Sequence, residues 1–356
     1  MSQKKIAIIL INYKTYAQRF LTESYESLLK LNYPKENYRI YIVDNETSEE
    51  TQKMLKDMAP EAVIVPNKEN SGWGGGNNAG IKQAIADGYD DYFAIVNMDT
   101  IFDQRFLEES LRVAESDPKI GIVQSKLLLH PPKNGEYLLN SKGNQITFIG
   151  FGYCGGDGEK DDVKDKVFDI VTAAGAGILV KKEVFTQAGW CDPDYFMYHD
   201  DIELSFKVKL MGYRLVLAPR SVIYHKHEFG RSIRQIYYME RNRFRFLLEF
   251  YKVKTLILIF PAFLIMEIGM LPYEIINRWL IIKLKVYIYF FRYKNIKQII
   301  KKRKQVQKLR TIPDRELLRN AVGVVQYQHV DNVLLRYIAN PVFKAYWTAA
   351  YKLLRW

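Results

Sequence analysis

The first 225 residues alternate short apolar runs with stretches of helical periodicity. The apolar runs are rich in β-branched side chains, as is typical of parallel strands that are buried on both faces. We expect strands at 6–11, 39–43, 62–65 and 92–96. We expect helices between them at 17–31, 48–58 and 77–88. This alternation of strand and helix predicts an α/β fold with a doubly wound sheet.

The pattern is weaker in the next part of the chain. Residues 125–170 are rich in Gly, Asn, Asp and Lys, and we expect one or two hairpins and flexible loops there. Regular structure returns at 172–180, where a run of Ala and Gly allows a close approach of other groups. A helix at 200–212 follows, then a strand at 214–217 and an apolar segment that ends at His225.

The pattern of apolar and charged residues changes again from about residue 231. An uninterrupted apolar run at 256–266 is shorter than the roughly 18–20 residues that span a bilayer. We expect prolines and acidic residues to break up this apolar segment, namely Pro261, Glu267, Pro272 and Glu274. Aromatic and aliphatic residues then mix with Lys and Arg over 279–291, before a basic run at 297–310. This predicts helices that lie in a membrane interface, with a helical subdomain packed on the catalytic core as the alternative.

The chain therefore divides into a catalytic domain at 1–230 and a helical, basic region at 231–356. The last helix, at 340–356, carries its large apolar side chains on one face, so it could dock on the core, bind lipid or mediate oligomerisation. These residues are Phe343, Trp347, Ala350 and Leu354.

The net charge of +12 is distributed unevenly along the chain. Between Lys226 and Arg310 there are 20 Lys or Arg, 5 Glu and no Asp, a local balance of +15 that leaves −3 for the rest. This predicts catalysis in one half and attachment to an anionic surface in the other. Cys154 and Cys191 offer neither a disulfide framework nor a metal motif, which indicates a reduced, intracellular protein. The first apolar run ends at Asn12 without a cleavage site, as a strand would and a signal peptide would not.

Polar residues follow two of the expected strands at the points where those strands end. Asp44 and Asn45 follow the second strand, and Asn97 and Asp99 follow the strand at 92–96. Ligands of α/β proteins bind at the carboxyl ends of strands, and a carboxylate there can hold a divalent metal against a diphosphate. For Asp44 an Asx turn that caps the next helix explains the residue equally well.

Glycine, acid and histidine motifs complete the candidate site. Glycines at 72–76 predict a loop whose following helix offers free N–H groups to phosphate, although a plain flexible loop is the alternative. Asp200 has capping-box spacing to Glu203, which leaves the adjacent Asp201 as a candidate general base. His225 ends an apolar segment and could be a further metal ligand.

The order of these signals resembles that of a family 2 inverting glycosyltransferase of the GT-A fold, over residues 5 to about 230. The strongest matches are "GWGGGNNAGI", "VNMDT" and "GWCDPDYFMYHDDIELSFKVKLMGY". The sequence is most similar to bacterial rhamnosyltransferases and galactofuranosyltransferases of cell-surface polysaccharide synthesis. Their carboxyl-terminal extension, with an Arg-Asn-Arg step, is similar to residues 237–318.

The resemblance implies a GT-A doubly wound mixed sheet and a set of donor contacts. The implied donor-binding residues are Asn12, Asp44, Asn45, Gly72, Trp73, Gly74, Asn78, Asn97 and Asp99. Asp99 would hold Mg²⁺ or Mn²⁺ on the diphosphate, with His225 as a further ligand. Asn97 replaces the first Asp of the usual Asp-x-Asp form, so one carboxylate fewer is available to the metal.

The resemblance also implies roles for residues on the acceptor side. Asp201 would deprotonate the acceptor hydroxyl and Asp200 would orient the acceptor sugar. Trp190 would stack on a sugar face, and His199 would contact the acceptor. Because inversion needs in-line attack, Asp201 would lie across the donor sugar from the metal at Asp99.

The implied protein is a membrane-associated glycosyltransferase that uses a UDP- or dTDP-sugar and a lipid-linked or oligosaccharide acceptor. We expect it at the cytoplasmic face of the cell membrane, as a peripheral or monotopic protein and possible homo-oligomer. A sugar nucleotidyltransferase is disfavoured, because the segment 12–16 after the first strand contains no glycine. A nucleic-acid-binding protein is disfavoured because the basic residues alternate with long aliphatic runs.

Overall fold

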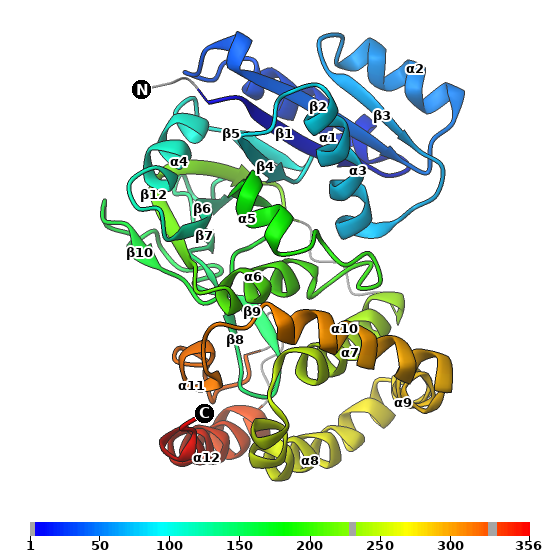
Figure 1. Cartoon of the computed structure of the whole chain (residues 1–356), viewed down its shortest axis with the longest axis vertical. Helices are drawn as coiled ribbons and strands as arrows, with labels where there is room; N and C mark the ends of the chain where they lie inside the picture. The colour runs from blue at the N-terminus through cyan, green and yellow to red at the C-terminus, as the bar shows by residue number, and fades with distance from the viewer. Residues whose placement is uncertain (1–3, 228–232, 327–332) are drawn as a thin grey trace.

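The computed structural model describes residues 4–227, 233–326 and 333–356. Figure 1 shows an α/β half that holds the amino terminus and a helical half that holds the carboxyl terminus. The helices of the first half are α1 (Tyr16–Leu28), α2 (Glu49–Met58), α3 (Gly72–Ala86), α4 (Phe106–Ala114), α5 (Lys182–Gln187) and α6 (Asp200–Leu210). The fold is therefore of the α/β class that the sequence predicts, followed by carboxyl-terminal helices.

A mixed sheet forms the centre of the α/β half. Its main strands are β1 (Ile6–Asn12), β2 (Tyr38–Asn45), β3 (Val63–Asn67), β4 (Tyr92–Val96), β6 (Ile120–Leu129), β11 (Gly177–Lys181) and β12 (Arg214–His225). Their order is β12-β6-β11-β4-β1-β2-β3, with β10 (Phe168–Asp169) at the β12 edge. β1 to β4 are parallel, whereas β11 is antiparallel to both of its neighbours, β4 and β6. The four expected amino-terminal strands are thus confirmed.

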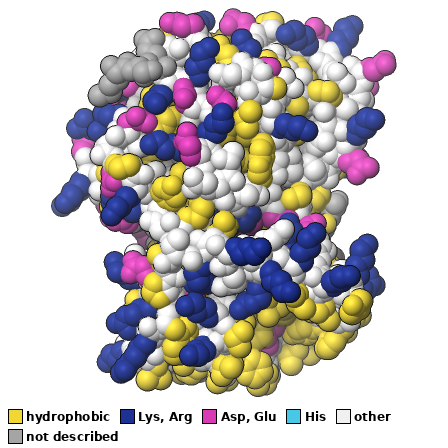
Figure 2. Space-filling model, in the orientation of Figure 1, with side chains coloured by type: hydrophobic (Ala, Val, Ile, Leu, Met, Phe, Trp, Pro, Cys, Tyr) yellow, Lys and Arg dark blue, Asp and Glu magenta, His cyan; other side chains and the backbone are white. Residues whose placement is uncertain are grey.

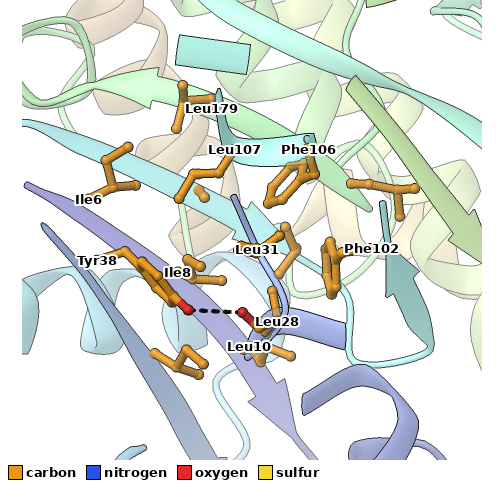
Figure 3. Close-up of a cluster of buried hydrophobic side chains, with 14 of the residues drawn as sticks. Ile6, Ile8, Leu10, Leu28, Leu31, Tyr38, Phe102, Phe106, Leu107 and Leu179 are labelled. Atoms are coloured by element: carbon orange, nitrogen blue, oxygen red, sulfur yellow. Dashed lines mark hydrogen bonds between the residues drawn. The ribbon is translucent and has the colours of Figure 1, made fainter. Parts of the chain in front are cut away.

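Helices cover both faces of the sheet because successive side chains of a strand point to opposite faces. Ile6, Ile8 and Leu10 of β1 pack in one cluster with side chains of α1 and α4. Figure 3 shows this cluster, in which the Tyr38 hydroxyl donates to the carbonyl oxygen of Leu28 at 3.0 Å. The intervening side chains of β1 pack with α3, α5 and α6 on the other face.

The region at 125–170 contains more strand than the sequence predicts. β6 extends to Leu129, and β7 (Leu139–Ser141) pairs with it. Earlier in the chain, β5 (Thr100–Phe102) pairs with β12. β8 (Asn144–Ile146) and β9 (Gly152–Cys154) form the expected hairpin. The strand expected at 172–180 begins only at Gly177, and the two segments expected at 214–217 and 222–225 are one bulged strand, β12.

Among the described residues 233–326 and 333–356, six helices form the carboxyl-terminal half. They are α7 (Ile233–Phe250), α8 (Val253–Ile276), α9 (Leu280–Phe291), α10 (Tyr293–Lys308), α11 (Asp314–Leu317) and α12 (Asn340–Leu353), with a π-helical turn at Leu335–Ala339. The expected apolar face of α12 is buried, and Trp347 stacks on Phe148 of the β8–β9 hairpin with ring centres 4.8 Å apart. Docking on the rest of the chain is therefore the alternative that holds for this face.

The prediction that prolines and acids break the apolar run at 256–266 is wrong. α8 continues through Pro261 and Pro272 for 24 residues. Glu267 and Glu274 lie two turns apart on one face, where both are buried in ion pairs with Lys283. By length and composition α8 could cross a membrane, and 28% of its most apolar stretch is buried.

The basic excess of this half is partly internal. Arg243, Arg245 and Lys283 are almost fully buried, and each forms ion pairs with buried carboxylates. The carboxylates offset the cost of burying these three charges. The three cations are consequently unavailable to an anionic surface, which reduces the surface charge that the sequence predicts for this region.

Candidate active site

A cavity of about 1060 Å³ lies between the carboxyl ends of the sheet strands and the helical half. This volume is at the upper end of the range for small-molecule sites. It brings together seven of the predicted site residues: Trp73, Asn97, Asp99, His199, Asp200, Asp201 and His225. The structure therefore joins motifs that are up to 152 residues apart in the sequence around one space.

Asp99 and His225 face one another on one wall of the cavity. The antiparallel pairing of β5 with β12 sets His225 opposite Thr100, the residue after Asp99. Nε2 of His225 lies 3.3 Å from Oδ1 of Asp99, and both atoms are buried without a hydrogen-bond partner. The other carboxylate oxygen of Asp99 accepts a hydrogen bond of 2.7 Å from the Tyr16 hydroxyl.

Two residues that the sequence did not reveal determine which ring nitrogen of His225 carries a proton. Nδ1 of His225 lies 2.8 Å from Oδ1 of the buried Asn140. The amide nitrogen of Asn140 donates to Asp157 at 3.0 Å, so its oxygen is the atom that faces the imidazole. Because a carbonyl oxygen only accepts, Nδ1 must donate, and a neutral His225 turns the lone pair of Nε2 toward Asp99.

This pair fits a divalent cation. A lone pair and a carboxylate oxygen that face one another at 3.3 Å repel unless a positive charge lies near both. Ligand atoms that bind Mg²⁺ at about 2.1 Å lie about 3 Å apart in neighbouring octahedral positions, which is close to the observed spacing. Within the described residues no group of three His, Cys, Asp or Glu is arranged to hold a metal. Asp99 and His225 would therefore supply two ligands and leave the remaining positions to other oxygens.

The charge of Asp99 suits this role. Burial acts to raise the pKa of Asp99, but the facing His225 imidazole in its protonated form and the Tyr16 hydroxyl lower it, and the net pKa is below its ordinary value. Asp99 is thus ionised at neutral pH even though only 5% of it is exposed.

Asp200 and Asp201 lie on another wall of the cavity, in the first turn of α6. The oxygens of Asp201 accept from the backbone N–H of Gly175 at 3.2 Å and of Ile202 at 2.8 Å. Oδ1 of Asp200 accepts from the N–H of Asp201, whereas its Oδ2 is buried without a partner. A side chain at Gly175 would lie within 3.3 Å of both Asp201 and Trp73, so glycine is needed for this approach.

Both carboxyl groups hold protons more tightly than a free aspartate does. Burial and the neighbouring charge of Asp201 raise the pKa of Asp200 to about 8. Burial also raises the pKa of Asp201. A carboxylate with raised proton affinity is a stronger base toward a hydroxyl group than an ordinary aspartate.

The segment before this pair is held in an unusual backbone conformation. Phe196, Tyr198 and His199 all have positive φ angles, between 61° and 67°. Such conformations cost free energy and persist only where the surroundings enforce them. Burial lowers the pKa of His199 to about 4, so its imidazole is neutral, and its Nε2 lies 2.9 Å from the carbonyl oxygen of Gly150. His199 therefore ties α6 to the β8–β9 hairpin.

Asn242 of α7 supports the same segment from the helical half. Its amide nitrogen lies 2.8–2.9 Å from the carbonyl oxygens of Tyr195, Met197 and Tyr198. Arg241 adds hydrogen bonds to the carbonyl oxygens of Asp194 and Tyr195. The Arg-Asn-Arg motif at 241–243 is the sequence feature that indicates a role for this part of α7. The sequence does not show that the motif binds the segment 194–198.

Three predicted donor residues form hydrogen bonds within the protein beside the cavity. Asn12 donates to Oδ1 of Asp44 at 3.0 Å, and Oδ2 of Asp44 accepts from Thr47 and Thr51. Asn45 accepts from the N–H and hydroxyl groups of Ser71. All three predicted residues are at most 2% exposed, and they join the ends of β1 and β2 to the start of α3. Their contact with a nucleoside stays a prediction.

The prediction of a loop at 72–76 is wrong, because these glycines form the first turns of α3. The glycines allow α3 to pack closely: a side chain at Gly74 would lie 3.2 Å from Cys191, and one at Gly72 would meet the carbonyl oxygen of Phe196. Asn78 bonds through its oxygen and its nitrogen to the backbone of Cys191. Of the predicted residues in this segment, Trp73 is the one that lines the cavity.

Trp190, predicted to stack on an acceptor sugar, has a different position. Its ring packs edge-on against Phe185, with ring centres 5.4 Å apart, outside the cavity. Its backbone has a φ angle of 66°. The ring therefore covers the core beneath α5 and is not part of the cavity wall.

Sequence comparisons decide the family to which this site belongs. The Glycosyl transferase family 2 profile matches residues 7–161, and the Glycosyl transferase family group 2 profile matches residues 92–290, more than half of the chain. The chain belongs to glycosyltransferase family 2. The second match runs from β4 through Asp99, the Asp200–Asp201 pair and His225 into the helical half.

Known relatives of this family 2 glycosyltransferase are distant. Over 201 residues the chain is 26% identical to the poly-beta-1,6-N-acetyl-D-glucosamine synthase of Staphylococcus aureus, a match that covers 56% of the chain and 45% of the synthase. It is 21% identical to the low-salt glycan biosynthesis hexosyltransferase Agl10 of Haloferax volcanii, over 67% of the chain and 74% of Agl10. The chain thus spans less than half of the length of the first relative.

Solved structures of low identity share the fold. The mannosyltransferase PcManGT of Pyrobaculum calidifontis, in complex with GDP-Man and Mn²⁺, superposes with a TM-score of 0.51 at 12% identity, over 86% of each chain. GalNAc-T7 with UDP, GalNAc and Mn²⁺ superposes with a TM-score of 0.53 at 13% identity, over 67% of this chain and 48% of that one. The family 2 glycosyltransferase described here has the GT-A fold that its sequence predicts.

Proposed function

We propose that this family 2 glycosyltransferase moves a sugar from a nucleoside diphosphate donor to an acceptor hydroxyl with inversion of configuration. The observation that carries the proposal is that Asp99 with His225 and Asp200 with Asp201 line the same cavity from different elements. One pair suits a charged leaving group and the other suits a hydroxyl that must lose a proton. The relatives with bound UDP or GDP-Man and Mn²⁺ support a donor of this class.

In the proposed reaction Asp99 and His225 would hold Mg²⁺ or Mn²⁺ together with the donor diphosphate. A divalent cation there supplies Lewis-acid stabilisation of the charge on the departing diphosphate. Asn140 keeps the Nε2 lone pair of His225 directed to this position. Asp99, ionised although buried, contributes the negative charge that attracts the cation.

Asp201 acts as the general base in this proposal. Its carboxylate accepts the proton of the acceptor hydroxyl while that oxygen attacks the anomeric carbon from the side opposite the diphosphate. Asp200 orients the acceptor and raises the proton affinity of the pair. General bases of this kind contribute about 10²- to 10⁴-fold to the rate.

We further propose a membrane-bound setting at the cytoplasmic face of the cell membrane. Figure 2 shows hydrophobic side chains gathered over the end of the molecule that is formed by α8 and α9. Ile257, Ile276, Ile281 and Phe291 are each more than 65% exposed there. Apolar surface beside Lys and Arg is typical of helices that lie in a membrane interface. The donor sugar is proposed to be rhamnose-like or galactofuranose-like, carried by UDP or dTDP.

The test begins with the donor. A thermal-shift screen of UDP- and dTDP-sugars with Mn²⁺ identifies the nucleotide that binds, and product analysis then follows transfer and anomeric configuration. Asp201→Asn is expected to lower the rate of transfer at least 10²-fold while donor binding stays within about threefold. Asp165→Asn, at an exposed carboxylate on the surface, is the matched control and should keep full activity. Near-normal transfer by Asp201→Asn would refute the assignment of the base.

A further inference from the structure

The cavity extends well beyond the residues that the proposed reaction uses. Its second arm lies between α7, α8, α9 and the segment from Leu334 to Phe343. Most side chains of this arm are apolar, among them Ile236, Met239, Met266, Met270, Ile282 and Phe343. The apolar arm, defined by these six residues and Gly269, is continuous with the space around Asp200 and Asp201.

The charged side chains near the apolar arm are already paired. Lys283 forms ion pairs with Glu240, with Glu267 at 2.7 Å and with Glu274 at 3.5 Å. The ammonium group of Lys283 is therefore fully paired with these three carboxylates. Lys283 is therefore unavailable to a phosphate or sugar in the arm, and a saccharide there would lose water without gaining comparable hydrogen bonds.

The arm opens at the exposed apolar end of the molecule. Ile265, Ile276, Leu334 and Ile338 line the arm and are between 56% and 78% exposed. A molecule that enters through this opening first contacts the apolar side chains of the arm. It reaches the carboxyl groups of Asp200 and Asp201 at the inner end of the cavity. The chemistry along the cavity therefore matches an amphipathic ligand with a polar group at one end and a hydrocarbon chain at the other.

We propose that the apolar arm binds the hydrocarbon chain of a lipid-linked acceptor, with the acceptor saccharide at Asp201. This inference rests on the proposed function, because it specifies the acceptor of that same site. The alternative occupants are bulk lipid against the outer face of α8 and a soluble oligosaccharide, and the experiment below separates both from the proposal. A chain in the arm would hold the acceptor hydroxyl near the base and exclude water from the cavity.

Gly269 provides a direct way to fill the arm. It lines the cavity in the middle of α8, and a Cβ atom added there would meet no other atom within 4 Å. Gly269→Leu and Gly269→Phe therefore occupy the arm in two steps without a clash at the backbone, and both remove a helix-weakening glycine. Ile257→Phe is the matched control, because Ile257 is 69% exposed on the same helix and does not line the cavity.

The binding probe is a series of n-alkyl maltosides from hexyl to dodecyl, used below their micellar concentrations with the full chain. A dodecyl maltoside that is brominated on its chain should quench the fluorescence of Trp279, which lines the arm. For the unmodified protein the affinity should rise about fourfold for each added methylene until the arm is filled. Gly269→Leu should weaken dodecyl maltoside binding, Gly269→Phe should weaken it at least tenfold, and Ile257→Phe should leave it unchanged.

Several results would overturn the proposal. The arm is not the binding site if the two Gly269 variants, folded by circular dichroism, keep the chain-length dependence of the unmodified protein. An equal loss of dodecyl maltoside affinity in Ile257→Phe would show that the probe binds to the outer face of α8 and not in the arm. Transfer to soluble oligosaccharides with no preference for alkyl glycosides would remove the lipid acceptor but keep the proposed function. That function fails separately, through full activity of Asp201→Asn.

Discussion

Replacing Asn140 with leucine should weaken metal binding without removing either of the two proposed ligands, Asp99 and His225. Leucine has the same number and branching of side-chain heavy atoms as asparagine but cannot accept from Nδ1 of His225 or donate to Asp157. The imidazole then loses the bond that fixes its proton on Nδ1, and the Nε2 lone pair is no longer reserved for a cation. Asn140 is only 2% exposed, so water cannot readily replace the lost acceptor.

Two independent estimates give the size of the effect. Loss of a residue that orients a ligating histidine typically lowers metal affinity 10- to 100-fold. An unpaired buried donor costs about 1–3 kcal/mol, which corresponds to a similar factor because about 1.4 kcal/mol is tenfold. We therefore expect the dissociation constant of Mn²⁺ to rise about 30-fold in Asn140→Leu, in the presence of the nucleoside diphosphate that binds best.

Electron paramagnetic resonance measures this constant directly, since free Mn²⁺ gives a strong six-line signal that diminishes on binding. The matched control is Asn77→Leu, which changes another fully buried asparagine whose side-chain oxygen has no partner. Asn77→Leu should leave the Mn²⁺ affinity unchanged. An Mn²⁺ dissociation constant within threefold of the unmodified value in Asn140→Leu would refute the reasoning, as would an equal loss in both variants.

Two further predictions concern stability. A side chain at Gly80 would lie 2.7 Å from Ile9 and 2.9 Å from Val43, so Gly80→Ala should destabilise the protein by about 1–3 kcal/mol in urea unfolding, whereas Gly269→Ala, in open space, should not. The raised pKa of Asp200, about 8, favours folding below the ordinary carboxyl pKa, and this contribution is lost as the pH rises through 8. Unmodified protein should therefore lose a few kcal/mol more stability between pH 5 and pH 9 than Asp200→Asn, and an equal loss in both would contradict the assignment.

The amino-terminal strands could be predicted because their apolar runs are long and undivided. β6 was missed because Gln124, Ser125 and Lys126 lie in its middle. In the fold, Gln124 accepts from the backbone N–H of Ala174, and Ser125 bonds to Ser221 of β12. Those partners are 50 and 96 residues away, so local sequence gives no sign that the polar groups are satisfied within the sheet.

In the candidate site too, some residues could be predicted from local sequence and others could not. Asp99 and Asp201 belong to recognisable local motifs, and the structure brings both to one cavity. Asn140 and Asp157 belong to no motif, because their importance lies in an orientation that only the packed structure defines. The glycines at the start of α3 predict a loop because glycine weakens an isolated helix. In the fold, close packing against Phe196, Cys191 and Ile11 explains Gly72, Gly74 and Gly76.

The hydrogen bonds from Asn242 to the segment before Asp200 have a consequence for how this enzyme family can diversify. A helix of the other half of the molecule holds the segment before Asp200 in its conformation, so the helical half cannot be exchanged independently of the α/β half. A chimera that joins a foreign carboxyl-terminal region to residues 4–227 would need an equivalent of Asn242 to keep Asp200 and Asp201 in position. Changes in the helical half and changes in the segment before Asp200 are thereby coupled.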